Sequence, residues 1–251
     1  MQSRLNEMER IFDQKTFNLF YNELICQGTF NESPQYYPRY QSRYRILLHE
    51  YSTLAPKNSQ DVLDIGGGQL ALLCKYLWDD NASAVDIGGP HLDYLKSKGV
   101  QTATWNFCSD EQPFNGEFNF IFFSEVIEHI PIPGHIILEK LKLALKPGGI
   151  LICSTPNLYR LRNVVYMILG KQIYDYFRIP ENHGLGHVLE YSYDHLKWQF
   201  ERAGFNLRKL EYYQMHHLPN NLIFRLMYLA GSPLFLVPRF RDNLVAIAQL
   251  L

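Results

Sequence analysis

The chain alternates short, nearly continuous apolar runs with longer stretches in which apolar residues recur every three or four positions. The first pattern predicts buried strands and the second predicts helices. In the middle of the chain, strands are predicted at residues 61–65, 83–87, 102–105, 118–124 and 150–154. Helices are predicted between several of them, at 70–78, 90–98 and 134–145. Such alternation indicates a parallel sheet that is covered on both faces.

The segments on either side of this alternating core carry different patterns. Before it, the chain is predicted to hold a helix within 3–27, a loop at 31–38 and a second helix at 41–54. After it, we predict a helix at 157–169, an irregular stretch at 170–190 rich in Tyr, His and Gly, a helix at 193–203, a strand at 205–213, a helical stretch at 220–230 and a strand at 243–251. The last two strands bring the sheet to seven.

These patterns predict a doubly wound α/β fold with a mostly parallel, seven-stranded, Rossmann-like sheet. We divide the chain into an N-terminal helical lid, residues 1–58, and a sheet domain, residues 59–251. The sheet domain contains an insertion at about 157–191, which is expected to cover a substrate, and a helical excursion at about 218–241. The apolar residues 221–230 carry few cations, so we expect them to pack internally or in a homodimer rather than lie on a membrane surface.

Composition restricts the class of protein. A content of 47% hydrophobic residues allows a core of normal size, and 24 basic against 25 acidic residues argue against a nucleic-acid partner. The four cysteines are scattered without a CxxC pair, which predicts free thiols in a reducing compartment. The polar first ten residues and the absence of an 18-residue apolar run predict no signal peptide, no transmembrane segment and a cytoplasmic location.

A strand that runs directly into glycines is the first feature with chemical meaning. Residues 62–65 are followed by Gly66, Gly67 and Gly68 and then by a predicted helix, which is the geometry of a nucleotide-binding turn. Glycine is needed there because the backbone must turn tightly and approach a ligand without a Cβ in the way. Gly66-x-Gly68-x-x-Ala71 also fits the dinucleotide pattern, so an NAD(P)-dependent oxidoreductase or a flavin enzyme is an alternative.

Asp64, two residues before the first glycine, favours a different cofactor. A carboxylate there would lie close to a bound pyrophosphate, and like charges ~4 Å apart cost about 4 kcal/mol at an effective dielectric constant near 20. S-adenosylmethionine has no phosphate and carries a cationic sulfonium and an ammonium group, which the same carboxylate attracts. The alternative is that Asp64 only caps the helix or braces the loop.

Asp86 ends the second predicted strand, 18 residues after Gly68. At that spacing an acidic side chain reaches the ribose diol of a bound nucleoside. Both cofactor classes use such a residue, so Asp86 supports nucleoside binding without choosing between them. As an alternative, Asp86 is an exposed strand-end residue without a role.

Several motifs in order resemble the class I S-adenosylmethionine-dependent methyltransferases. They are Val-Leu-Asp-Ile-Gly-Gly-Gly at 62–68, Val-Asp-Ile at 85–87, Pro113-Phe114 with Phe-Asn-Phe-Ile at 118–121, Glu-Val-Ile-Glu-His at 125–129, Leu-Lys-Pro-Gly-Gly at 145–149 and Ser-Thr-Pro-Asn at 154–157. The likeness is strongest to the small-molecule branch that includes ubiquinone-biosynthesis O-methyltransferases and sugar and natural-product methyltransferases. It covers about residues 60–160, and more weakly the stretches at 189–192 and 203–205.

The resemblance implies roles for residues at the ends of the third and fourth predicted strands. Asn106 and Phe107 would hold the adenine, with Cys108 as an alternative, and Ser124 and Glu125 would flank the methionine part. Two departures are Leu70, where the family has a third glycine, and Asn119, where it has Asp. The predicted cofactor set is therefore Asp64, Ile65, Gly66, Gly67, Gly68, Asp86, Ile87, Asn106, Phe107, Ser124 and Glu125.

A hydroxyl acceptor also requires removal of its proton, by a base or by a metal ion. Glu125, Glu128 and His129 lie at i, i+3 and i+4, so in a helical turn they share one face at the ligand-binding edge of the sheet. With Asn157 they form a candidate site for Mg²⁺ or a similar ion, which the resemblance supports through its Glu-x-x-Glu-His motif. The alternatives are His129 as a metal-free base, or a structural role for Glu128 and His129.

Other residues compete for the same tasks. His183 and His187 lie in the insertion and are further candidates for the base, with a surface position as the alternative. The residues that we expect to close over the cofactor as a lid, unless they only pack between helices, are Tyr36, Tyr37, Arg39, Tyr40 and Arg43.

The sequence therefore predicts an enzyme that transfers a methyl group from S-adenosylmethionine, with Mg²⁺ as a candidate second cofactor. The acceptor is expected to be a hydroxyl, less readily an amine, of a small molecule such as a sugar or a secondary metabolite in natural-product biosynthesis. The competing classes are an NAD(P)-dependent oxidoreductase and a non-catalytic binding module that retains the cofactor fold.

Overall fold

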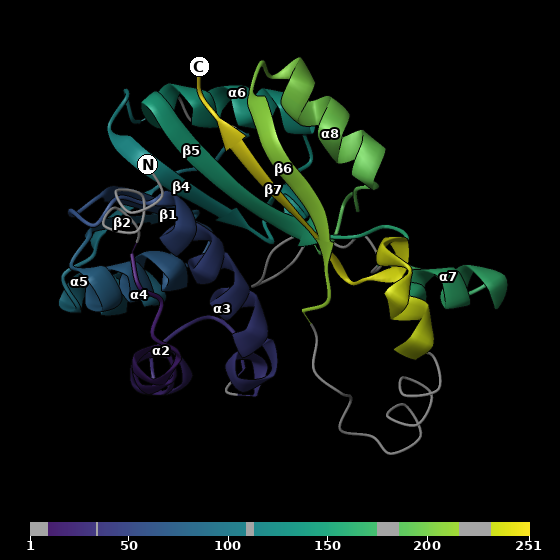
Figure 1. Ribbon diagram of the computed structural model, residues 1–251, viewed down its shortest axis with the longest axis horizontal. Helices are drawn as coiled ribbons and strands as arrows, with labels where there is room; N and C mark the ends of the chain where they lie inside the picture. The colour runs from purple at the N-terminus through teal and green to yellow at the C-terminus, as the bar shows by residue number, and fades with distance from the viewer. Residues whose placement is uncertain (1–9, 34, 109–112, 175–185, 216–231) are drawn as a thin grey trace, which may run out of the picture.

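A seven-stranded sheet with the strand order β3-β2-β1-β4-β5-β7-β6 forms the centre of this computed structural model (Figure 1). The structure describes residues 10–33, 35–108, 113–174, 186–215 and 232–251. The strands are β1 (Asp61–Ile65), β2 (Asn81–Asp86), β3 (Gln101–Thr104), β4 (Phe118–Ser124), β5 (Leu145–Pro156), β6 (Asn206–Tyr213) and β7 (Asn243–Gln249). The sheet is parallel except for β7, which runs antiparallel to both β5 and β6. The predicted doubly wound, mostly parallel sheet is confirmed.

Helices cover both faces of the sheet, as the continuous apolar strands require. One face is covered by α2 (Gln14–Phe20), α3 (Tyr36–Leu54), α4 (Gln69–Trp78) and α5 (His91–Ser97), and the other by α6 (Gly134–Ala144) and α8 (Tyr193–Arg202). The remaining elements are the π-helix η1 (Tyr21–Cys26), the short α7 (Leu161–Ile168) and the 3-10 turns η2 (Ile127–His129), η3 (Ser232–Leu236) and η4 (Pro238–Phe240).

Three predicted boundaries were wrong for identifiable reasons. Helix α3 begins at Tyr36, inside the predicted loop. The helix tolerates Pro38 because this residue lies in the first turn, where a missing backbone N–H costs no hydrogen bond. Helix α7 begins at Leu161 rather than 157, because Asn157 forms a bridge with Tyr191. Strand β5 begins at Leu145, where it pairs with Phe118 before its register shifts. The helix predicted at 220–230 lies outside the described residues.

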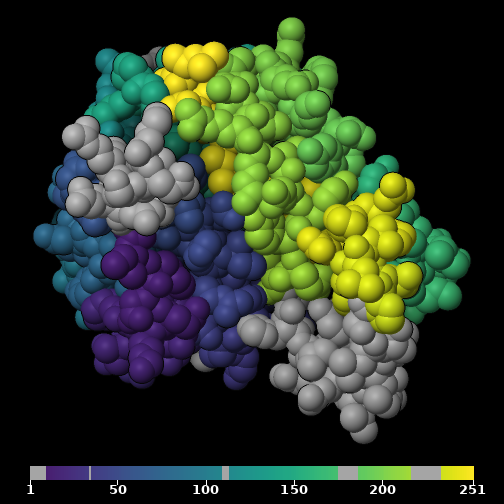
Figure 2. Space-filling view, in the orientation of Figure 1, coloured from purple at the N-terminus to yellow at the C-terminus, as the bar shows by residue number. Residues whose placement is uncertain are grey.

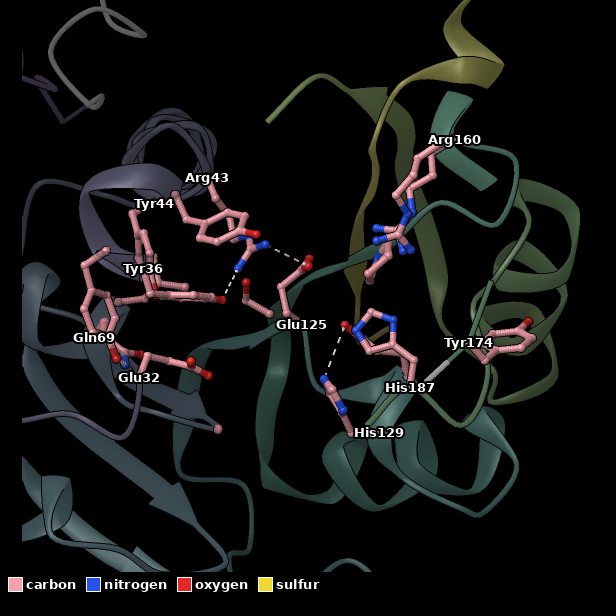
Figure 3. Close-up of a pocket in the computed structure, with 18 of the residues that line it drawn as sticks. Glu32, Tyr36, Arg43, Tyr44, Gln69, Glu125, His129, Arg160, Tyr174 and His187 are labelled. Atoms are coloured by element: carbon pink, nitrogen blue, oxygen red, sulfur yellow. Dashed lines mark hydrogen bonds and ion pairs between the residues drawn. The ribbon is translucent and has the colours of Figure 1, made fainter. Parts of the chain in front are cut away.

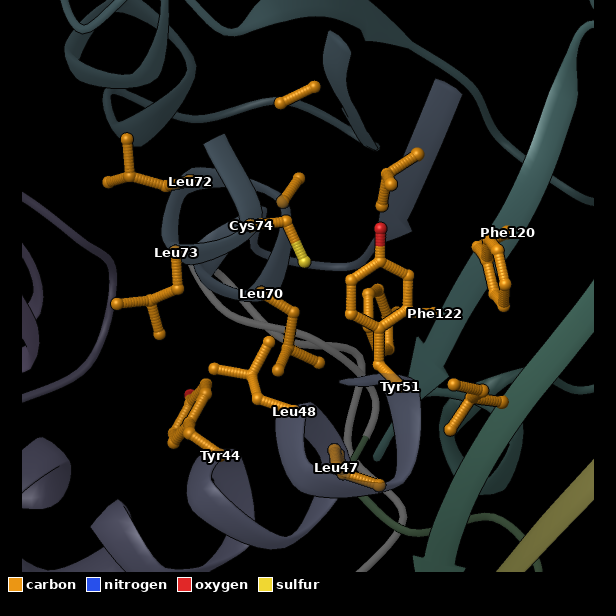
Figure 4. Close-up of a cluster of buried hydrophobic side chains, with 14 of the residues drawn as sticks. Tyr44, Leu47, Leu48, Tyr51, Leu70, Leu72, Leu73, Cys74, Phe120 and Phe122 are labelled. Atoms are coloured by element: carbon orange, nitrogen blue, oxygen red, sulfur yellow. The ribbon is translucent and has the colours of Figure 1, made fainter. Parts of the chain in front are cut away.

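The helices predicted as an N-terminal lid share one hydrophobic core with the sheet. Tyr44, Leu47, Leu48 and Tyr51 of α3 meet the apolar face of α4 and the inward side chains of β4 (Figure 4). Leu70, which replaces the family's third glycine, points into this core and is 2% exposed. In Figure 2 the surface of α2 is continuous with that of α3, so the described part of the first 58 residues packs as part of the sheet domain.

A buried ion pair ties the start of the described chain to the sheet. Both terminal nitrogens of Arg10 donate to the carboxylate of Asp80 at 2.6 Å, just before β2. Asp80 also accepts from the hydroxyl of Tyr51 at 2.6 Å and from the backbone N–H of Gln60 at 2.8 Å. Arg10 donates further to the backbone carbonyls of Pro56 and Asn58. The hydrogen bonds from Arg10 and Tyr51 to Asp80 therefore join the N-terminal segment to the sheet.

Among the described helices, none combines the length and the apolar character needed to cross a membrane. All four cysteines are free; Cys74 and Cys153 are buried, Cys26 is half-buried, and Cys108 is exposed.

Replacing Arg10 by Met is expected to lower the free energy of unfolding by about 3 kcal/mol or more, because Asp80 would remain buried without its counter-charge. Urea denaturation measures this difference. Arg45→Met, at an exposed position of α3, is the matched control and should change stability by less than about 0.5 kcal/mol. If both substitutions change the free energy of unfolding by the same small amount, the Arg10–Asp80 ion pair does not stabilise the packing of the N-terminal segment.

Candidate functional site

The glycine turn between β1 and α4 is held by its conformation and by the packing behind it. Gly66 and Gly68 adopt φ values of +85° and +77°, which residues with a Cβ rarely adopt. A Cβ on Gly66 would lie 2.4 Å from Val126, and one on Gly68 would lie 2.4 Å from Leu95 and 2.7 Å from Ala84. Glycine is therefore required here by both backbone and neighbours, which agrees with the predicted nucleotide-binding turn.

Asp64 fastens this turn to the helix that follows. Its Oδ2 accepts hydrogen bonds from the backbone N–H groups of Leu70 at 2.7 Å and Ala71 at 3.3 Å, in the first turn of α4. Burial raises the pKa of Asp64 to about 7, although these backbone hydrogen bonds act to lower it. The bracing role that the sequence left open is thus present, and the carboxyl also lines the main cavity.

The ends of β2 and β3 lie beside the turn. The N–H of Gly66 donates to the carbonyl of Val85, and the N–H of Trp105 donates to the carbonyl of Asp86, so the three strand ends are joined in sequence. Asp86 contacts His91 at 3.3 Å and accepts from the N–H of Ile87 at 2.6 Å. Asp86, Ile87 and Asn106 thus lie at one edge of the sheet, Ile87 and Asn106 being exposed there.

The ring of Phe107 belongs to the core beside this edge of the sheet. Its side chain is 6% exposed and packs on Trp105, with 4.0 Å between ring centroids. Its carbonyl accepts a hydrogen bond from Lys140 at 2.5 Å. The adenine contact expected of Phe107 was one by its backbone, and it stays a prediction.

A cavity of about 590 Å³ opens beside Gly66 and Asp64 and extends to the insertion (Figure 3). On the α3 side it is lined by Tyr36, Tyr37, Tyr40, Arg43 and Tyr44, of which Tyr44 was not predicted. Four of the five predicted lid residues therefore reach the cavity. The fifth, Arg39, is exposed and does not line it.

Glu125 is the central acidic residue of this cavity. It has a positive φ of 57°, which is an unfavourable conformation for a residue with a Cβ. Its backbone N–H donates to the backbone carbonyl of Ser154 at 2.8 Å. Its carboxylate accepts from the Ser154 hydroxyl and from Asn243, both at 2.9 Å, and pairs with buried Arg43 at 3.0 Å. Ser124, the neighbouring predicted contact, shares a hydrogen bond with Ser154 at 2.8 Å.

Glu128, His129 and His187 form a second group in the same cavity. Each offers one donor atom, and the three atoms lie within 4.8 Å of one another. Glu128 is fully buried; one carboxyl oxygen accepts from Thr155, and the other is 3.9 Å from Nε2 of His129. Burial and the nearby charge of Glu125 raise the pKa of Glu128 well above its ordinary value. The two imidazole rings meet edge to face, 4.8 Å between centroids.

This grouping differs from the predicted metal set of Glu125, Glu128, His129 and Asn157. The structure leaves Asn157 out, because its amide is fully buried, donates to the carbonyls of Arg239 and Arg241, and accepts from the N–H of Tyr159. Glu125 is turned toward Arg43 (Figure 3). The predicted set of two carboxylates, one imidazole and an amide oxygen is therefore not assembled, and His187 joins Glu128 and His129 instead. His183 lies outside the described residues.

His187 is oriented by Glu190, a residue that the sequence reasoning missed. Nδ1 of His187 lies 2.8 Å from the carboxylate of Glu190, which also pairs with Arg160 and accepts from Asn163 at 2.5 Å. Burial acts to raise the pKa of Glu190, but the bonds from His187, Arg160 and Asn163 hold it below its ordinary value. An ionised carboxylate only accepts, so Nδ1 of His187 donates, and in the neutral imidazole the lone pair is then on Nε2.

Comparisons with known proteins identify the family of this chain. The model of a methyltransferase domain family matches residues 38–210, more than half of the chain. The chain therefore belongs to this family. No curated protein sequence matches it.

Solved structures share the fold at low sequence identity. An S-adenosylmethionine-dependent methyltransferase from Archaeoglobus fulgidus has a TM-score of 0.58 at 17% identity, covering 93% of this chain and 99% of that one. A possible histamine N-methyltransferase from Thermotoga maritima has a TM-score of 0.58 at 15% identity, with 93% and 99% covered. A 4+2 cyclase, SpnF, has a TM-score of 0.56 at 16% identity, with 89% and 84% covered. The likeness establishes the methyltransferase fold and leaves the acceptor open.

Asp64→Asn should stabilise the protein without cofactor at pH 8, because Asn still accepts from Leu70 but buries no charge. Since the native pKa is about 7 against an ordinary 3.8, wild-type stability falls as pH rises from about 4 to about 7 and then levels. Urea denaturation from pH 5 to pH 8 should give a stability gap between variant and wild type that widens with pH, reaching on the order of 2–4 kcal/mol. A gap independent of pH would contradict the raised pKa.

Proposed function

We propose that this protein transfers a methyl group from S-adenosylmethionine to a hydroxyl group of a small molecule. The observation that carries the proposal is a single cavity with a glycine turn at one side and an imidazole oriented by a carboxylate at the other. Membership of the methyltransferase domain family supports the reaction type. The hydroxyl acceptor is our inference from the base, since a neutral amine attacks without losing a proton first.

The cofactor side fits a cationic donor. In this assignment the turn at Gly66 meets the nucleoside, Asp86 accepts from the ribose diol, and the acidic side chains Asp64 and Glu125 lie toward the sulfonium and the ammonium group. Arg43 adds a permanent cation in the same wall, and it would bind the carboxylate of the methionine part. An NAD(P) cofactor is disfavoured, because its pyrophosphate would face Asp64 across the turn.

The acceptor side supplies the base. His187 receives the hydroxyl proton on Nε2, while Glu190 fixes its tautomer and stabilises the imidazolium that results. As the oxygen attacks, the bond to the methyl carbon forms, and the carbon–sulfur bond breaks with its electron pair left on sulfur. The products are the methyl ether, neutral S-adenosylhomocysteine and a proton on His187. The enzyme otherwise positions the reactants and removes water.

A metal-assisted version of the reaction is a second candidate. It is favoured by one carboxyl oxygen of Glu128, which is buried and has no hydrogen-bond partner among the described residues. Glu128, His129 and His187 would hold the ion, and one carboxylate with two imidazoles suits Mn²⁺, Fe²⁺ or Zn²⁺ better than Mg²⁺. Such an ion lowers the pKa of a hydroxyl that it coordinates.

Titration with S-adenosylhomocysteine tests the cofactor assignment. We expect Asp86→Ala to weaken binding roughly 10- to 100-fold, as loss of a charged hydrogen-bond partner does. Asp93→Ala, an exposed carboxylate on α5, is the control and should leave the Kd unchanged. Binding of NAD in place of S-adenosylhomocysteine would overturn the proposed function. Binding of the cofactor without consumption of S-adenosylmethionine in the presence of the acceptors would indicate a non-catalytic binding module.

His187→Ala should reduce kcat by a factor of about 10² to 10⁴, the usual contribution of a positioned base, while the Kd for S-adenosylhomocysteine stays constant. Formation of S-adenosylhomocysteine with a panel of small hydroxylated acceptors gives the readout. Glu190→Gln should also lower kcat, because a neutral amide stabilises the imidazolium less, and the exposed His49→Ala serves as control. If EDTA abolishes turnover and Mn²⁺ restores it, the metal-assisted reaction is supported and the role of His187 as a metal-free base is contradicted.

A further inference from the structure

Two arginines line the acceptor side of the cavity and take no part in the proposed methyl transfer. Arg160 immediately precedes α7, and Arg162 lies in its first turn. In Figure 3, Arg160 lies with His187 and Tyr174 across the cavity from Arg43 and Glu32. Neither arginine belongs to a motif of the glycine turn or of the Glu125–His129 segment, and only the fold brings them to this wall.

Both arginines depend on one carboxylate. Arg160 pairs with Oε1 of Glu190, and Arg162 is 3.8 Å from the same oxygen, which also receives the Nδ1 bond of His187. The neutral amide of Asn163 supplies the remaining contacts, accepting from Arg160 at 3.2 Å and from Arg162 at 3.1 Å. The direct contacts of this cluster therefore set two permanent cations against one ionised acid, and Glu125 and Asp242 also act on Arg160 electrostatically.

The other acidic residues that line the cavity do not remove this surplus. Glu125 is paired with Arg43, and Asp64 faces the glycine turn. Glu32 lies beside Gln69 on the far side of the cavity (Figure 3). Glu128 is fully buried against Thr155, and its raised pKa favours the neutral form. The charges of the cavity are therefore separated, with acids toward the cofactor turn and unneutralised cations toward the acceptor.

The guanidinium groups retain donors for a ligand. Among the described residues, Nη1 of Arg160 and Nη1 of Arg162 have no hydrogen-bond partner. The side chain of Arg160 is 7% exposed, so its charge is largely removed from bulk water, whereas Arg162 is 51% exposed and faces the opening. A planar guanidinium presents its N–H groups in a fork that matches a carboxylate or a phosphate.

We propose that the acceptor carries an oxyanion, either a carboxylate or a phosphate, which Arg162 binds together with Arg160 beside the hydroxyl that is methylated. The inference rests on the proposed function and narrows its substrate to small hydroxy acids or phosphorylated alcohols. Arg160 and His187 share Oε1 of Glu190, so an anionic group bound by the arginines lies close enough to the base to be part of the same small molecule as the reacting hydroxyl. Arg162 is then a binding residue that determines specificity, and Arg160 positions it and the base.

Binding of simple anions tests this inference directly. Inorganic phosphate and malonate are titrated separately into wild-type protein saturated with S-adenosylhomocysteine, at constant ionic strength set with chloride. We expect one site with a millimolar Kd for at least one anion, and a tenfold or greater loss in Arg162→Met. Arg162→Lys should lose less, because it keeps the charge but not the fork. Arg202→Met, an exposed cation on α8 away from the cavity, should bind as wild type does.

Each outcome has a distinct meaning. Binding of phosphate alone identifies a phosphorylated acceptor, binding of malonate alone identifies an acid, and binding of both supports the shared oxyanion chemistry. Absence of anion binding, or binding that Arg162→Met leaves intact, overturns the inference while the proposed function stands. Failure to bind S-adenosylhomocysteine defeats the proposed function itself. With an acceptor in hand, Arg162→Met should raise KM at least tenfold and change kcat less than twofold.

Discussion

The hydrogen bonds from the backbone of Leu70 and Ala71 to the carboxyl of Asp64 are the contact on which the site depends. They fix the first turn of α4 against the end of β1, on either side of the glycine turn with its positive φ values and its lack of room for a Cβ beside Val126 and Leu95. A carboxyl in this position is costly to bury, as its raised pKa indicates. That cost is reasonable where the ligand that arrives is a cation.

Charge separation across one cavity is the second organising feature. Strand β1, the residue after β4 and helix α3 supply Asp64, Glu125 and Arg43, whereas the insertion and the start of α7 supply His187, Arg160 and Arg162. Glu190 joins the second group, since it orients the imidazole and receives Arg160 with the same oxygen. In the proposed function, positioning of the base and binding of the anion are therefore coupled through a single buried carboxylate, and a change at Glu190 is expected to alter both.

The methyltransferase fold is shared by proteins of different chemistry, and the particular residues of the acceptor side therefore decide the function. The fold is common to the structures from Archaeoglobus fulgidus and Thermotoga maritima and to the cyclase SpnF at identities of 17%, 15% and 16%. On the acceptor side of this chain lie an imidazole held by Glu190 and two arginines with unused donors. We propose that these residues select an acceptor that is acidic and hydroxylated.

Local patterns were sufficient to predict the strands, the covered sheet and the glycine turn. Burial of a strand requires a run of apolar residues, and positive φ values favour glycine, so both features can be recognised in neighbouring residues. Glu125, Glu128 and His129 were also found from their spacing, and they do lie in one cavity. Their partners were not, because Arg43, Asn243 and Ser154 approach Glu125 from three separate elements. Asn157 was predicted as a metal ligand from its position after β5. Its amide instead donates hydrogen bonds to the backbone carbonyls of Arg239 and Arg241, next to η4.

By itself the sequence determined the fold class and predicted the residues of the cofactor side, since both depend on periodicity and on motifs shorter than ten residues. Only the tertiary structure decided the acceptor side. The stretch at 186–190 has no periodicity, and its His and Glu gain a role only where the chain returns past α7 and places them against Arg160 and Arg162. Long-range contacts between irregular segments carry no signature in local sequence, and the chemistry that distinguishes this protein is made of such contacts.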